Sequence, residues 1–251
     1  MKTQDKKTRR ARGIFISGTD TGVGKTIVAA AIALYLRKAG IRVAVLKPVT
    51  SGAVVIDGRL CSEDAELLRW ASRCAAPDAD IAPYLLREPL APSESAAREG
   101  VVIRIGPIRE AFERLCVNHD FVIVEGAGGL LVPLAKDLLV ADLVEELSLP
   151  LLIVARPNLG TVNHTLMTCE CARSRGIEII GVVINGQSDQ PDSAEEYAPR
   201  VISHYGAVSV SAVLPRCAAG NEKLIVETVA TSIEKQPLAA LLPLEVSHEN
   251  P

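Results

Sequence analysis

Short apolar runs rich in valine and isoleucine alternate with helix-forming segments along most of this chain. Continuous apolar strands separated by helices are typical of a parallel sheet that helices cover on both faces. The strand-like runs are 13–17, 42–48, 120–126, 150–157, 177–185 and 207–215. The helix-like segments are 25–38, 62–73, 141–148, 161–176, 193–206 and 222–242. The alternation predicts an α/β fold with a single doubly wound, mostly parallel sheet.

One domain is enough to account for the length of the chain. Its 251 residues, 48% of them apolar, can bury one substantial core. The stretch 77–107 contains five prolines and predicts long loops or short broken helices. We expect the domain to span 13–242, after a flexible basic tail at 1–12 and before a C-terminal tail at 243–251.

The segment "GTDTGVGKT" (18–26) resembles a phosphate-binding loop with an extra residue. Five residues separate its first glycine from Gly24, where the usual pattern has four. The segment follows a predicted strand and opens a predicted helix, which turns backbone N–H groups toward a phosphate. A tight strand–helix turn would explain Gly24 but not Lys25 and Thr26 beside it. The loop indicates a nucleotide-binding fold of the P-loop NTPase type, in which Lys25 meets the β- and γ-phosphates and Thr26 ligates Mg²⁺.

Two carboxylates are candidates to complete a magnesium site with Thr26. Glu125 ends the apolar run "FVIVEG", where a carboxylate is costly unless a positive group meets it. Asp64 follows the second strand in "CSEDAELL". Mg²⁺ prefers oxygen ligands, and doubly wound sheets place their ligands near the carboxyl ends of strands. By itself, Asp64 is also explained as an acidic residue at a helix start.

Charge and cysteine content disfavour several other classes of protein. The 27 lysines and arginines against 30 aspartates and glutamates give a net charge of −3. That balance provides no basic field for nucleic acid, and no apolar run is long enough to span a membrane. The six cysteines are scattered without CxxC pairs. We therefore expect a cytoplasmic protein with reduced thiols that binds neither nucleic acid nor membrane.

Five motifs in the same order resemble the dethiobiotin synthetase family. They are "GTDTGVGKT", "KPVTSG" (47–52), "EGAGGLLVPL" (125–134), "LGTVNH" (159–164) and "VVIN" (182–185), and the match covers roughly 13–222. The resemblance implies an ATP- and Mg²⁺-dependent ring closure. One amine of 7,8-diaminononanoate takes up CO₂ as a carbamate, which attacks the γ-phosphate of ATP. The second amine then displaces phosphate and closes the cyclic urea of dethiobiotin.

The resemblance also implies roles for individual residues. Lys47, Lys25 and Thr21 are the expected catalytic residues, with Lys47 meeting the carbamate and phosphoryl oxygens. The expected nucleotide-binding residues are Gly22, Val23, Gly24, Lys25, Thr26, Ile27, Asp64, Glu125, Gly126, Ala127, Gly128, Asn185, Gly186, Pro215, Arg216, Cys217 and Glu222. Of these, Asn185, Gly186, Pro215 to Cys217 and Glu222 match the positions at which the family reads adenine. Gly126, Gly128 and Gly129 are expected to let the backbone approach a ligand closely. The expected substrate-binding residues are Ser51, Leu159, Gly160, Thr161 and Tyr197. The last four imply a homodimer in which Tyr197 reaches the partner's site.

Some positions depart from the family pattern. Leu130 stands where some relatives carry an aromatic residue, and Pro92-Ser93 replaces a frequent Pro-His pair. His164 is expected on a helix surface or in the core and not in proton transfer.

Two other classes of protein contain this type of nucleotide-binding domain and are alternatives to this family. An amidase of the cobyrinic-acid type needs a glutaminase domain, for which this chain has no room. A partitioning or septum-positioning ATPase carries a lysine at the position of Asp20 and tends to carry aspartate where Glu125 stands. Both differences favour the ring-closing ligase.

Overall fold

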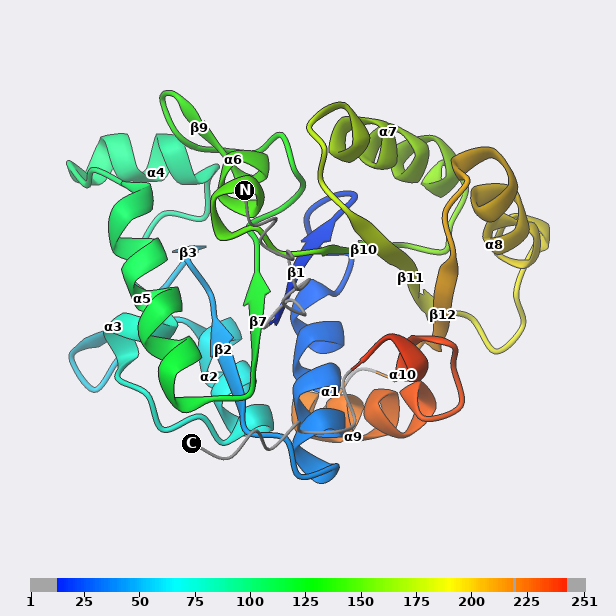
Figure 1. Cartoon of the computed structure of the whole chain (residues 1–251), viewed down its shortest axis with the longest axis horizontal. Coiled ribbons are helices and arrows are strands. Elements are labelled where there is room, and N and C mark those ends of the chain that lie inside the picture. Colours follow the sequence, from blue (N-terminus) through cyan, green and yellow to red (C-terminus); the bar gives the residue numbers. More distant parts are fainter. Residues whose placement is uncertain (1–12, 219, 243–251) are drawn as a thin grey trace, which may run out of the picture.

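The computed structural model describes residues 13–218 and 220–242. The tails expected at 1–12 and 243–251 lie outside the described residues. Figure 1 shows a central sheet with helices on either side. Among the described residues, no helix combines the length and the apolar character needed to cross a membrane.

A six-stranded parallel sheet forms the centre of the molecule, in the order β12-β11-β10-β1-β7-β2. The strand runs predicted from the sequence are therefore confirmed, and the sheet is wholly parallel. Its strands are β1 Gly13–Gly18, β2 Val43–Leu46, β7 Phe121–Glu125, β10 Leu151–Ala155, β11 Ile179–Gln187 and β12 Val210–Pro215.

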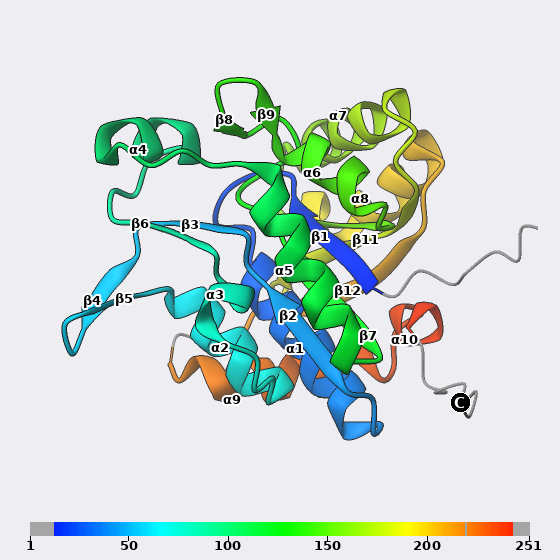
Figure 2. The same ribbon diagram turned by 60° about the vertical axis from the view of Figure 1, so that its left-hand side comes forward.

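Helices cover both faces of this sheet, as predicted (Figure 1). One face carries α1 Lys25–Lys38, α2 Glu63–Ser72 and α9 Glu222–Ile233, which pack against one another. The other carries α5 Ile105–Asn118, α6 Val140–Leu147, α7 Thr161–Ser174 and α8 Ser193–Gly206. Figure 2, which brings the β2 edge of the sheet forward, shows α5 on one side of this strand and α1 and α2 on the other.

Smaller elements occupy the connections. Two short helices, α3 Asp78–Ile81 and α4 Pro92–Glu99, lie in the proline-rich stretch, as expected there. The stretch also holds an unpredicted strand, β6 Tyr84–Leu86, which pairs with β3 Val49–Ser51. Two antiparallel ribbons complete the set: β4 Val54–Ile56 with β5 Arg59–Cys61, and β8 Pro133–Ala135 with β9 Leu138–Leu139.

Two predictions about helices are wrong in detail. The helix α5 was not predicted, because Gly106 and Pro107 resemble a break in the sequence. Both lie in its first turn, where backbone N–H groups have no partner within the helix and proline is tolerated. The single helix expected over 222–242 is divided into α9 and α10 Leu238–Leu241, because Pro237 cannot donate the hydrogen bond that would continue it.

The strand order reverses between β1 and β7, which are neighbours in the sheet. The chain leaves β1 for α1 on one face, whereas it leaves β7 for α6 on the other. Ligands of doubly wound sheets bind at such a point, outside the carboxyl ends of the strands. The glycine loop follows β1, Glu125 ends β7 and Lys47 follows β2, so all three meet at this edge.

Candidate active site

The glycine loop is fastened to the end of β11. Gly22 and Gly24 have φ angles of 73° and 88°, a left-handed conformation that side chains other than glycine rarely adopt. A side chain at Gly24 would also begin 2.1 Å from the amide nitrogen of Asn185. That amide donates a hydrogen bond of 3.1 Å to the carbonyl of Val23. The loop is therefore shaped by its own glycines and by a side chain from another strand.

Lys25 begins α1 and is buried, with its ammonium 3.3 Å from the carbonyl oxygen of Asp20. Burial lowers the pKa of Lys25, although the charge of Glu125 acts in the opposite direction. Asp20 also accepts a 2.7 Å hydrogen bond from the backbone of Thr21 and pairs with Arg156, which follows β10. The loop thus holds a buried cation with its own backbone.

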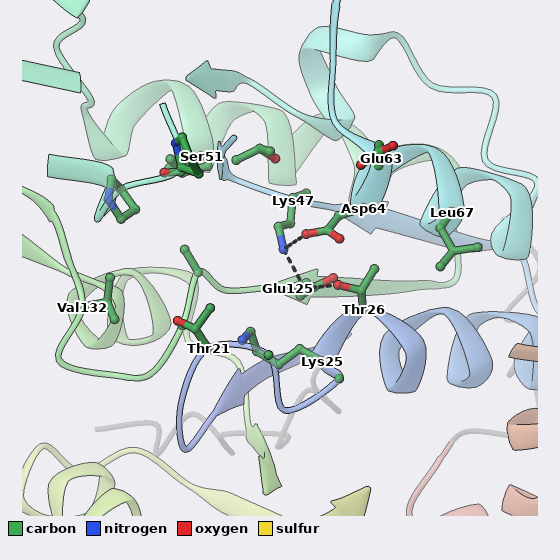
Figure 3. Close-up of a pocket in the computed structure, with 18 of the residues that line it drawn as sticks. Thr21, Lys25, Thr26, Lys47, Ser51, Glu63, Asp64, Leu67, Glu125 and Val132 are labelled. Carbon is green, nitrogen blue, oxygen red and sulfur yellow. Dashed lines mark hydrogen bonds and ion pairs between the residues drawn. The ribbon is translucent and has the colours of Figure 1, made fainter. Parts of the chain in front are cut away.

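Lys47 joins the two predicted metal-binding carboxylates. Its ammonium lies 2.6 Å from Glu125 and 2.7 Å from Asp64, and the hydroxyl of Thr26 donates a 2.8 Å hydrogen bond to Glu125 (Figure 3). Burial disfavours the charge on Lys47, but Glu125 and Asp64 outweigh burial and raise its pKa. Burial likewise acts to raise the pKa of Asp64, yet the ammonium of Lys47 holds that pKa below its usual value. Both groups are therefore charged at neutral pH.

The donor set at this point suits a divalent cation. Thr26, Asp64 and Glu125 offer the oxygen ligands that Mg²⁺ prefers. Glu125 is fully buried, and its Oε2 has no hydrogen-bond partner among the described residues. A buried carboxylate oxygen without a partner is costly. Lys47 and Thr26 bind only Oε1, so a cation at Oε2 would satisfy the oxygen that they leave without a partner.

A cavity of about 780 Å³ opens over these groups. It brings together many residues predicted from the sequence: Thr21, Gly22, Gly24, Lys25, Thr26, Ile27, Lys47, Ser51, Asp64, Glu125, Ala127, Gly128 and Glu222. Pro92, one of the departures from the family pattern, also lines the cavity. Sequence reasoning did not assign the rest of its wall: Val49, Thr50, Glu63, Leu67, Pro89, Leu90, Ala91 and Val132. Much of that wall lies in the proline-rich stretch, where no residue pattern indicated contact with the phosphate loop.

The residues predicted to bind the nucleotide base form a second group beside the cavity. Asn185 and Gly186 are at the carboxyl end of β11, and Pro215 ends β12 next to it. The backbone N–H of Arg216 donates to the carbonyl of Gln187 at 2.7 Å. Cys217 follows directly and is half-buried. The structure therefore brings these predicted residues together, at the end of neighbouring strands.

The remaining predicted substrate residues do not line this cavity. Leu159 is 90% exposed and Tyr197, on α8, is 51% exposed. Gly160 caps α7 with a φ of 96°, and Thr161 is buried with no hydrogen-bond partner for its hydroxyl among the described residues. The exposed His164 on α7 is placed on a helix surface, as expected.

Two glycines of the "EGAGG" motif also pack closely against other parts of the protein. We expected Gly126 and Gly129 to let the backbone approach a ligand. A side chain at Gly126 would begin 2.8 Å from the ring of Phe15, and one at Gly129 would begin 3.1 Å from the carbonyl oxygen of Gly18. A side chain at Gly126 would therefore have to displace its neighbours, and one at Gly129 would lie unusually close to the backbone. Gly128, with a φ of 62°, lines the cavity.

Comparison with known proteins identifies relatives over most of the chain. A family model described as an AAA domain matches residues 12–223. The ATP-dependent dethiobiotin synthetase BioD of Bacillus licheniformis is 40% identical over 82% of this chain and 86% of its own length. The proteins of the same name from Bacillus subtilis (strain 168) and Anaeromyxobacter dehalogenans are 38% and 47% identical over 88% and 72% of this chain, and 95% and 80% of theirs.

Solved structures with the same fold are more distant in sequence. A ParA family ATPase from Chlorobium tepidum superposes with a TM-score of 0.55 at 18% identity, covering 91% of this chain and 94% of its own. The MinC:MinD cell division complex of Aquifex aeolicus gives a TM-score of 0.57 at 16% identity, covering 94% and 99%. At such identities the likeness concerns the fold alone.

Proposed function

This chain belongs to the ATP-dependent dethiobiotin synthetase family, and on that premise we propose how its cavity closes the ring of dethiobiotin. The reaction consumes 7,8-diaminononanoate, CO₂ and ATP and yields dethiobiotin, ADP and phosphate. The observation that carries the assignment to this cavity is the cluster of Lys47, Asp64, Glu125 and Thr26 beside the phosphate loop.

The cavity offers two ammonium groups for a reaction between anions. Lys25 lies in the phosphate loop, and Lys47 faces it across the carboxylates (Figure 3). Lys25 would hold the β- and γ-phosphates of ATP, and Lys47 would meet the carbamate and the transferring phosphoryl group. Fixed positive groups aimed at developing negative charge lower the barrier because they need no reorganisation during the step.

Ser51 is placed to orient the diamine. Its hydroxyl is buried, lines the cavity and has no hydrogen-bond partner among the described residues. Such a group is satisfied when a carbamate or amine binds beside it. Thr21, across the cavity, offers a second hydroxyl (Figure 3).

Ring closure would take three steps. One amine adds to CO₂ and loses a proton, giving a carbamate. A carbamate oxygen attacks the γ-phosphorus, and the bond to the ADP oxygen breaks. The second amine attacks the carbamate carbon and loses a proton, the carbon–oxygen bond to phosphate breaks, and the ring closes. Lys47 and Lys25 would stabilise the charge in the second step, and the enclosing walls would keep water from the mixed anhydride.

Mg²⁺ would be held by Thr26, Asp64 and Glu125. When bound with ATP it neutralises charge on the β- and γ-phosphates. Lys47 already contacts both carboxylates, so its charge would help to fix their side chains before the cation arrives.

Asn185 would select adenine. Because its amide nitrogen donates to Val23, its carbonyl oxygen is left as the acceptor. An acceptor suits the exocyclic amino group of adenine and repels the carbonyl oxygen of guanine at the same position.

A second copy of the chain would complete the substrate site. The exposed Leu159 and Tyr197 lie outside the cavity of their own subunit, and an exposed leucine and tyrosine near a site suit an interface. We assign them to a homodimer in which Tyr197 contacts the carboxylate of the substrate in the partner's site. The site of action would be the cytoplasm.

The function is tested by incubating the protein with 7,8-diaminononanoate, bicarbonate, ATP and Mg²⁺ and detecting dethiobiotin by mass. We expect one ADP per dethiobiotin. Parallel samples with DNA or anionic lipid vesicles in place of the diamine should show no added ATP hydrolysis. Hydrolysis stimulated by DNA or vesicles, with no product from the diamine, would place the chain with the partitioning ATPases.

The shared site is tested by mixing two inactive variants, Lys25→Ala and Tyr197→Ala. After subunit exchange, a mixed dimer would contain one intact site and one site with both defects. At equal amounts, random pairing should restore about a quarter of wild-type activity. If Tyr197 acts within its own subunit, every site keeps a defect and mixing restores nothing. Tyr205→Ala, an exposed tyrosine on the same helix, should remain active by itself and serves as the control.

A further inference from the structure

Glu195 is a buried residue whose carboxylate accepts hydrogen bonds from residues outside its own helix. It lies in the first turn of α8 and is 4% exposed. Acidic residues at this position commonly stabilise the helix start by bonding its free N–H groups. Here Asp192 performs that task, accepting a 2.9 Å hydrogen bond from the Glu195 backbone. The Glu195 carboxylate instead accepts from the backbone of Ser188 at 3.1 Å and from the Arg216 guanidinium at 3.4 Å.

These bonds hold the segment that follows Asn185. The Arg216 guanidinium also donates to the carbonyl of Gly186 at 3.2 Å, and the Arg216 backbone donates to Gln187. The amide of Gln187 donates in turn to the backbone carbonyl of Glu195 at 3.2 Å. The backbone from 186 to 188 is thus held from one side by α8 and from the other by the end of β12.

We propose that Glu195 is a positioning residue for recognition of the nucleotide base. The inference rests on the proposed function, because it takes the base to lie between Asn185-Gly186 and the 215–217 segment. Glu195 touches both sides of that space and does not line the cavity of the phosphates. A buried carboxylate is costly unless it is paired, and such pairs can hold a geometry that apolar packing would not.

The location of Glu195 predicts which kinetic constant responds. The phosphates would be held by the loop around Lys25, and the chemistry would occur at Lys47. A shift in the base segment weakens the hydrogen bonds to adenine but leaves both lysines in place. Loss of Glu195 should therefore raise the KM for ATP and reduce discrimination against GTP, with little change in kcat.

The test compares Glu195→Gln with Glu196→Gln, which makes the same change of charge at the exposed neighbouring residue. For Glu195→Gln we expect a KM for ATP about tenfold higher, kcat within about twofold, and an ATP-to-GTP preference about tenfold lower, as loss of one charge-assisted hydrogen bond implies. Glu196→Gln should match wild type in all three. Arg216→Gln should also lower the preference, and the loss in the double variant should be smaller than the sum of the two single losses, because the two side chains share one contact.

Calorimetric titration with non-hydrolysable ATP and GTP analogues separates this inference from the proposed reaction, because it needs no turnover. A wild type that prefers ATP but makes no dethiobiotin would refute the reaction alone. An unchanged ATP-to-GTP preference in Glu195→Gln, with or without a lower melting temperature, would show an ordinary helix-start acid and overturn the inference. A wild type that binds both analogues equally, or neither, would overturn it as well. If Glu195→Gln does not fold, Arg216→Gln decides, since that side chain is largely exposed.

Discussion

Replacement of Lys47 by alanine is expected to lower kcat by about 10²–10³-fold, the usual cost of one positioned electrostatic donor. ATP binding should change less, because Lys25 and the phosphate loop remain. The matched control is Lys38→Ala, an exposed lysine at the end of α1, which should retain wild-type activity. Steady-state kinetics with the diamine and nucleotide titrations measure the two effects separately. Turnover near the wild-type rate would remove Lys47 from the proposed machinery.

The same substitution should also destabilise the protein. Lys47 neutralises Glu125, which is fully buried, and breaking such a pair by removing one partner typically costs about 3–5 kcal/mol. The double variant Lys47→Met with Glu125→Gln removes both charges. Its unfolding free energy should recover most of that loss, while its activity stays low. Recovery of stability would show that the loss in Lys47→Ala comes from the buried charge of Glu125 left without its partner.

Replacement of Glu125 by glutamine should sharply raise the Mg²⁺ concentration needed for turnover. The variant exchanges a buried anionic oxygen without a partner for a neutral amide. We expect a shift of at least about tenfold, since loss of even an outer partner of a metal site costs about 10–100-fold in affinity. Asp64→Asn should shift the requirement less, because that side chain is 43% exposed.

The control for the metal variants is Glu66→Gln, an exposed carboxylate on the same helix as Asp64. It should leave the Mg²⁺ titration unchanged. A Glu125→Gln protein with wild-type rate and wild-type metal dependence would strike Glu125 from the metal ligands, and the same outcome for Asp64→Asn would strike Asp64.

The meeting of Lys47 with its two carboxylates could be foreseen from the sequence in part. Carboxyl ends of parallel strands share one edge of a sheet, so Lys47 after β2 and Glu125 at the end of β7 had to lie near the phosphate loop. The fold followed from the same reasoning, because buried parallel strands have an unmistakable apolar pattern. What the pattern did not reveal was that one ammonium would contact both Asp64 and Glu125.

Features that depend on the path of a connection could not be predicted this way. The wall from Pro89 to Pro92 reaches the cavity through a proline-rich stretch that carries no periodic pattern. In the sequence Glu195 resembles an ordinary acidic residue at a helix start, because its two partners lie on the preceding connection and just after the end of β12. Such long-range side-chain contacts depend on tertiary packing and leave no signal at fixed spacing.

The likeness to the distant structural relatives concerns the fold alone. The septum-positioning and partitioning ATPases are expected to carry a lysine where Asp20 stands. In this chain Asp20 pairs with Arg156 and holds the backbone of Thr21, so the position carries a negative charge that is used within the loop. The likeness of the sheet therefore gives no reason to extend their activities to this protein.

One measurement tests most directly the claim that this cavity closes a ring by phosphorylating a carbamate. The protein is given the diamine, ATP, Mg²⁺ and ¹⁸O-labelled CO₂, and the reaction is stopped before the CO₂ exchanges its oxygen with water. The masses of the products are then measured by mass spectrometry. Because one carbamate oxygen attacks phosphorus and the other stays on carbon, we predict one ¹⁸O in the released phosphate and one in the carbonyl of dethiobiotin. Unlabelled phosphate, formed without dethiobiotin, would mean that water attacks ATP in this cavity and would contradict the account.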